Sequence, residues 1–165
     1  MRFWILSLSV ILGVVIQSTW LPALNLPGQI VPDLILIMVI TYALLRGSDE
    51  GLIFGLCAGF FVDILSGGLI GVQAATKILA GYSVGLLEKT IFKDNLLLPA
   101  LAVFVGTIFL ELLNFIMYLA FKVNTNFFDL MVNVTFPLAF YNALLAPLIY
   151  YLFLKLERYL MERVH

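Results

Sequence analysis

Long runs of apolar residues set the strongest limit on how this chain can fold. Residues 3–23 contain no charged side chain, and residues 96–121 contain one, Glu111. A helix that crosses a bilayer needs about 20 predominantly apolar residues. The chain is 63% hydrophobic and 12% charged, whereas soluble domains are roughly 45–50% apolar and about 25% charged. We therefore predict an integral membrane protein.

Charged residues and Pro/Gly clusters divide the chain into six apolar segments. They cover residues 3–23, 31–45, 51–66, 69–87, 96–121 and 130–154. We predict six transmembrane helices, so that residues 1–165 form one all-α, polytopic domain with antiparallel neighbours. The second and third segments are near the ~17-residue lower limit for a span. A re-entrant hairpin is the alternative for these two, but Arg46, Asp49 and Glu50 would be costly at its buried tip.

The basic residues predict the orientation, because short loops that carry the excess of Lys and Arg stay in the cytoplasm. With a cytoplasmic N-terminus, the only basic loop residue on the outer side is Lys122. The inner side then carries Arg2, Arg46, Lys89, Lys93, Lys155, Arg158 and Arg163. We therefore predict that both termini are cytoplasmic.

Residues that carry most enzyme and metal chemistry are scarce in this sequence. Cys57 is the only cysteine, and His165, the last residue, is the only histidine. No HExxH motif or Ser/His/Asp arrangement is present. The formal net charge of −1 offers no basic surface for nucleic acid. We predict no catalytic residue, metal or cofactor, and no nucleic-acid partner.

Glycines recur at four-residue spacing in the third and fourth segments. The third segment contains Gly51, Gly55 and Gly59, and the same helix face continues to Asp63 and Gly67. In the fourth segment Lys77, Gly81 and Gly85 share a face. Small residues at this spacing let two helix backbones approach closely in lipid. We predict that these ridges contact another helix, either within the chain or from a partner.

Three ionisable residues lie inside the apolar segments, where a charge costs roughly 2.5–3.5 kcal/mol or more. By helical rise, Asp63, Lys77 and Glu111 lie about 5, 12 and 15 Å below the outer helix ends. Asn114 shares a helix face with Glu111. We predict a polar network of these four residues. Within it Lys77 pairs with Glu111, whose depth matches slightly better, or with Asp63, which an outward-snorkelling lysine would approach. A ligand pocket or a proton relay is the functional alternative.

The last segment contains Pro137 and Pro147 within a helical run. Each proline removes a backbone donor and bends the helix. Asn142 lies one turn before Pro147, and we expect its side chain to bond a freed backbone group.

Several stretches, in order along nearly the whole chain, resemble the rod shape-determining membrane protein family MreD. They are "QSTWLP", "PDLILIMV", "RGSDEGLIFGLCAGFFVDILSGGLIGVQA", "GYSVGLLEKTIF" and "FPLAFYNALLAPLIYYL". The most specific positions are Pro32 and Asp33, Asp63 with Ser66, Gly67 and Gly68, and Tyr141 with Asn142. Lys77 is not part of this pattern.

The resemblance implies a non-enzymatic protein of the bacterial inner membrane that helps organise lateral wall synthesis. The implied partners are MreC, the actin homologue MreB, the glycosyltransferase RodA and a class B penicillin-binding transpeptidase, together with membrane lipid. The implied fold is that of the six-helix substrate-binding component of energy-coupling-factor transporters. The alternative function is therefore a vitamin-type uptake component, which predicts a polar outer pocket near Asp33, Asp63 and Lys77.

Overall fold

The computed structural model describes residues 2–23, 25–66, 71–88, 97–120 and 126–162 of the chain. All regular structure in these ranges is helical, which confirms the predicted all-α class. The first rod consists of α1 (Arg2–Val15), a π-helical turn η1 (Ile16–Trp20) and α2 (Leu21–Ala23). It is followed by a 3-10 turn η2 (Pro27–Gln29), α3 (Leu34–Arg46), α4 (Ser48–Ser66), α5 (Val72–Gly85) and α6 (Leu97–Ala120). The last rod joins α7 (Phe127–Leu130), the π-helical turn η4 (Met131–Thr135) and α8 (Phe136–Glu162).

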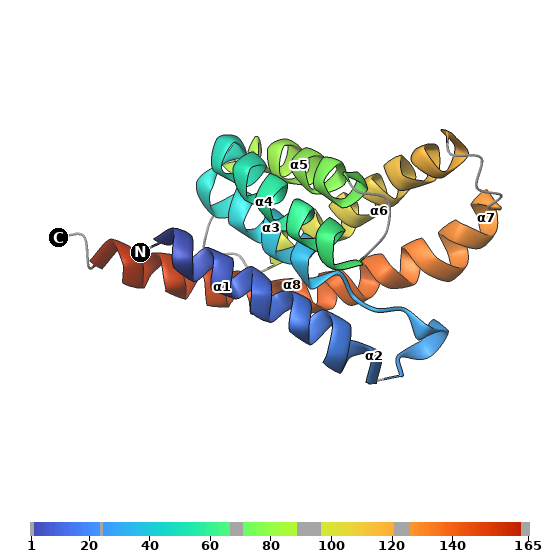
Figure 1. The fold of residues 1–165 in the computed structure, drawn as a ribbon, viewed down its shortest axis with the longest axis horizontal. Coiled ribbons are helices and arrows are strands. Elements are labelled where there is room, and N and C mark those ends of the chain that lie inside the picture. Colours follow the sequence, from blue (N-terminus) through green and yellow to red (C-terminus); the bar gives the residue numbers. More distant parts are fainter. Residues whose placement is uncertain (1, 24, 67–70, 89–96, 121–125, 163–165) are drawn as a thin grey trace.

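Helix length and composition agree with a polytopic membrane protein. Three helical stretches are long and apolar enough to cross a membrane, Ile5–Ala23, Leu97–Ile116 and Phe127–Tyr159. Helices α3, α4 and α5 overlap with the second, third and fourth predicted segments. α1 begins and α8 ends at the same end of the bundle (Figure 1). That all six rods are full spans stays a prediction.

Helix α3 forms the centre of the bundle (Figure 1) and contacts α1, α4, α5, α6 and α8. Ile35, Ile37, Val39 and Ile40 are fully buried. The 13 residues of α3 rise only about 20 Å. Protein rather than lipid covers most of its surface, so this helix can be shorter than a full span without exposing its end groups to lipid.

A tight turn joins α3 to α4. Gly47 ends α3 with a φ of 92° and donates its N–H to the Ala43 carbonyl oxygen, and a positive φ of this kind favours glycine. Next to the turn, Arg46 lies 3.1 Å from the carboxylate of Glu50 and 3.7 Å from that of Glu157 on α8. These ion pairs join three helices at the end of the bundle that the sequence predicts to be cytoplasmic.

Candidate functional site

Asp63 caps the start of the next helix. Its carboxylate accepts the backbone N–H groups of Gly71, Gln73 and Ala74 over 2.9–3.0 Å, and its side chain is 2% exposed. The first N–H groups of a helix have no partner within that helix, and their partial positive charge suits a carboxylate. Asp63 on α4 therefore fixes the N-terminus of α5, and this interaction holds its charge within the bundle.

Lys77 pairs with Asp33, so the prediction that its partner is Glu111 or Asp63 was wrong. The Lys77 Nζ atom lies 2.9 Å from Asp33 Oδ2 and 2.6 Å from Gln73 Oε1. Asp33 precedes α3 and also accepts the N–H of Leu36, as an N-cap residue does. The lysine side chain therefore connects α5 with the N-terminal end of the central helix.

Asn142 extends this contact to α6 and α8. Its Oδ1 accepts the backbone N–H of Asp33 over 2.9 Å, and its Nδ2 donates to Thr107 Oγ1 over 3.1 Å. Asn142 and Thr107 are both fully buried. We expected the Asn142 side chain to bond a backbone group freed by Pro147. Instead, it connects α8 with Asp33 and with α6. Four helices meet at Lys77, Asp33, Asn142 and Thr107, which are linked through side chains and the Asp33 backbone N–H and which we name the polar lock.

Glu111 and Asn114 form a separate pair. Asn114 Nδ2 donates to Glu111 Oε1 over 3.1 Å. Asp33 and Lys77 lie within electrostatic range of Glu111, but the ion pair of Lys77 is to Asp33. The predicted single network is therefore divided among the Asp63 cap, the polar lock and the Glu111–Asn114 pair.

The remaining family-motif positions lie around these groups. Pro32 is buried beside Asp33, and Tyr141 is partly buried beside Asn142. Ser66 is exposed, and its hydroxyl lies 3.4 Å from the Asp63 carbonyl oxygen. Gly67 and Gly68 lie outside the described residues.

The glycine ridge of α4 packs against the backbone of α5, so its predicted helix contact is confirmed. A Cβ atom added to Gly59 would lie 2.5 Å from Ala74 Cα, and one added to Gly55 would meet the carbonyl oxygen of Lys77. A Cβ atom on Gly51 would lie 2.6 Å from the carbonyl oxygen of Gly81. Only residues without side chains allow this approach.

The ridge of α5 is the other half of the same seam. A Cβ atom on Gly81 would meet the carbonyl oxygen of Gly51, and one on Gly85 would lie 2.5 Å from Ser48 Cα. The two ridges therefore face each other within one chain. Their role is to hold α4 against α5, and a partner protein has to use another surface.

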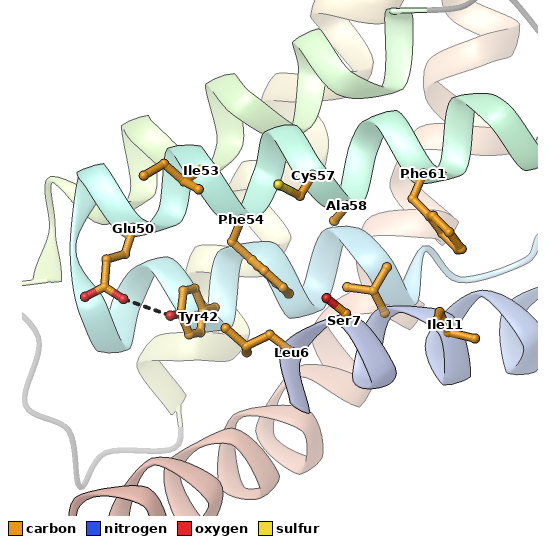
Figure 2. Close-up of a pocket in the computed structure, with 11 residues that line it drawn as sticks. Leu6, Ser7, Ile11, Tyr42, Glu50, Ile53, Phe54, Cys57, Ala58 and Phe61 are labelled. Atoms are coloured by element: carbon orange, nitrogen blue, oxygen red, sulfur yellow. Dashed lines mark hydrogen bonds between the residues drawn. The ribbon is translucent and has the colours of Figure 1, made fainter. Parts of the chain in front are cut away.

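A groove of about 430 Å³ lies between α1, α3 and α4 (Figure 2). One end carries the Tyr42 hydroxyl, which donates to Glu50 over 2.8 Å. The other lining residues, mostly apolar, are Leu6, Ser7, Val10, Ile11, Ile53, Phe54, Cys57, Ala58 and Phe61. We name this feature the α1–α4 groove.

No pattern in the sequence indicates this groove, because the groove depends on how α1 docks. α1 packs on α3, where a Cβ atom on Gly13 would lie 2.9 Å from Ile35 Cδ1. Further along the first rod, Gln17 Oε1 accepts the N–H of Ile35 over 3.4 Å. This placement leaves the adjacent face of α4, including the exposed Cys57, uncovered.

One comparison with known proteins gives a match. A family model described as the rod shape-determining protein MreD matches residues 1–160 of the chain. No curated protein and no solved structure matches the chain.

Proposed function

The chain belongs to the MreD family of rod shape-determining proteins, and from this membership we propose that it is a non-enzymatic scaffold of the cell-elongation machinery. In this role it binds MreC and helps to organise lateral peptidoglycan synthesis at the bacterial cytoplasmic membrane. Both of its termini face the cytoplasm, and MreB, RodA and a class B penicillin-binding transpeptidase belong to the larger complex. The family match over nearly the whole chain is the observation that carries the proposal.

The use of the intramembrane polar groups supports a scaffold. Asp63 is bonded to three backbone N–H groups, and Lys77 and Asp33 are bonded to each other. Each of these bonds connects one helix to another or to the segment that precedes it. Buried polar groups that are fully paired rigidify a structure, and a rigid bundle suits a protein that positions its partners.

The α1–α4 groove is our candidate for the MreC contact. The glycine ridges are already used within the chain, whereas the groove is uncovered and includes the short side chains of Ser7, Cys57 and Ala58. Association of helices in membranes relies on close packing at small residues rather than on a hydrophobic driving force. A transmembrane helix of MreC therefore has a surface here on which it can pack.

Co-purification with MreC in mild detergent tests the proposal. We expect wild-type protein to retain MreC, and Cys57→Phe, which fills the groove, to retain about tenfold less, equivalent to ~1.4 kcal/mol. Leu56→Phe is the matched control, because Leu56 is an exposed neighbour that does not line the groove. Failure of the wild type to retain MreC would contradict MreC binding. Equal retention by both variants would contradict only the groove.

The alternative function, a transporter component, requires a small-molecule site at the residues of the polar lock and the Asp63 cap. A small polar substrate near Asp33, Asp63 and Lys77 would have to displace internal bonds of 2.9–3.0 Å. Native mass spectrometry of the purified protein separates the two functions. We expect no stoichiometric small-molecule adduct, and a retained vitamin-like molecule would favour the transporter.

A further inference from the structure

The last turns of α8 have a face that packs on the bundle. On this face Phe153 is buried, and its ring lies against those of Tyr42 on α3 and Phe54 on α4, with centroids 6.3 and 6.4 Å away. One turn further along the same face, the buried Glu157 lies 3.7 Å from Arg46. These contacts fix how the end of α8 is rotated, so that the residues opposite them point away from the bundle.

The opposite face combines two basic side chains with two tyrosines. Lys155 and Arg158 are exposed, as are Tyr151 and Tyr159. Residues three and four apart are neighbours on the surface of a helix. Tyr151 therefore adjoins Lys155, and Lys155 adjoins both Arg158 and Tyr159. The four side chains form one continuous surface on a single helix, which we name the α8 basic patch.

The α8 basic patch lies where the last rod leaves the hydrocarbon region, at the end of the bundle where α1 begins (Figure 1). The apolar stretch Phe127–Tyr159 has 33 residues, which rise about 50 Å, whereas the hydrocarbon core is about 30 Å thick. The ion pair of Glu157 with Arg46 marks the membrane boundary, because charged groups are costly in hydrocarbon. Lys155 and Arg158 are within two residues of Glu157 and therefore lie within about 3 Å of this level along the helix axis.

We propose that the α8 basic patch binds the head group of an anionic phospholipid such as phosphatidylglycerol, an interaction separate from the scaffold function and from MreC. The Lys155 ammonium and the Arg158 guanidinium pair with the lipid phosphate, as basic residues at a membrane surface do. Glu157 does not oppose this pairing, because it is buried on the other face and lies beside Arg46.

The tyrosines of the patch favour a lipid over a soluble partner. Tyr151 and Tyr159 each have an apolar ring and a polar hydroxyl, a combination that suits the level of the lipid head groups. The stems of long basic side chains likewise cover apolar surface while their charged ends stay in water. The bound lipid holds the end of α8 at a fixed depth, next to the ion pairs that join α3, α4 and α8.

Lipid binding by the purified full-length protein tests the α8 basic patch. Phosphatidylglycerol or phosphatidylcholine with the same acyl chains is titrated into the protein in a non-ionic detergent, and native mass spectrometry gives the population of lipid-bound protein. We expect the wild type to bind phosphatidylglycerol about thirtyfold more tightly, equivalent to ~2 kcal/mol, because two basic residues face the anionic head group. The Lys155→Gln/Arg158→Gln variant should lose this preference.

The matched control is Lys155→Arg/Arg158→Lys, which keeps both charges and should keep the preference. Because both positions are exposed, each variant should have the Tm of the wild type when no lipid is added. Equal affinity of the wild type for the two lipids would overturn the proposal. Loss of a co-purified protein from the glutamine variant would in that case assign the patch to a protein partner. A preference that survives in the glutamine variant would overturn the assignment to α8.

Discussion

The ion pair between Lys77 and Asp33 predicts which of two single substitutions lowers the free energy of unfolding more. Asp33→Asn keeps an oxygen that caps α3, but it leaves the Lys77 ammonium, 2% exposed, without its carboxylate. Loss of one partner of a buried pair costs about 3–5 kcal/mol. We expect Asp33→Asn to fall in this range.

Lys77→Met should lower the free energy of unfolding by less than Asp33→Asn does, because the Asp33 carboxylate that it leaves unpaired is less buried than the Lys77 ammonium. The Asp33 side chain is 22% exposed, and its other oxygen still accepts the N–H of Leu36. This carboxylate is therefore less buried than the ammonium and keeps one hydrogen-bond donor, so we expect a loss of about 1–2 kcal/mol, below the range for a fully stranded partner. In the double variant no charge is stranded, so its loss should be smaller than the sum of the single losses by about 1–3 kcal/mol.

The assay is a double-mutant cycle on the free energy of unfolding in detergent micelles. A parallel cycle between Lys77→Met and Glu111→Gln is the control, and its coupling should be smaller because the two side chains are not paired. The reasoning is refuted if the coupling of Lys77 to Asp33 is within about 0.5 kcal/mol of zero. It is equally refuted if Asp33→Asn is the milder single substitution.

Three further predictions concern packing, capping and orientation. Gly55→Ala should lower the free energy of unfolding by about 1–3 kcal/mol, because its Cβ atom would meet the backbone of α5. Gly13→Ala is the control and should cost little, because its Cβ atom would meet only the ends of side chains. Equal losses in the two variants would contradict the close packing of α4 on α5. Asp63→Asn removes a carboxylate that accepts three N–H groups and should cost about 1–3 kcal/mol in the same assay. With the native cysteine replaced, an impermeant thiol reagent added outside intact cells should label Asp129→Cys and not Arg158→Cys, and the reverse result would invert the orientation.

Hydropathy predicted the helices well because each one is a local property of the sequence. The third predicted segment, 51–66, corresponds to α4 at Ser48–Ser66, which begins one turn earlier. The charges of Asp49 and Glu50 concealed that first turn, although acidic residues suit the N-terminus of a helix. The glycine ridges were also predictable, since a four-residue spacing marks one face of a helix.

Partners across the bundle were harder to predict, because they depend on the register between helices. Depth below the helix ends favoured Glu111 and Asp63 as partners of Lys77, whereas Asp33 lies near the start of the predicted segment 31–45 and directly before the observed α3. The sequence nevertheless contains two indications that Asp33 is the partner. Asp33 stands directly before an apolar helical run, where N-cap residues occur, and it lies on the predicted side toward which a lysine can snorkel. The Asp63 cap similarly follows from an aspartate near the end of one helix, a Gly-rich turn and the start of the next helix.

One feature had no counterpart in the sequence. The α1–α4 groove arises from the docking of α1 on α3, which depends on side-chain packing along both helices.

Cell shape provides the test of whether the buried charges are architectural. The Asp33→Asn/Lys77→Met double variant removes both charges of the pair while avoiding a stranded one, and it is expressed at the wild-type level in cells depleted of the native protein. If the chain is a scaffold whose polar lock only holds the bundle together, these cells should remain rods and the variant should still retain MreC. Round cells that contain a folded, membrane-inserted double variant bound to MreC would contradict this account, because the charges would then act on a ligand or a proton.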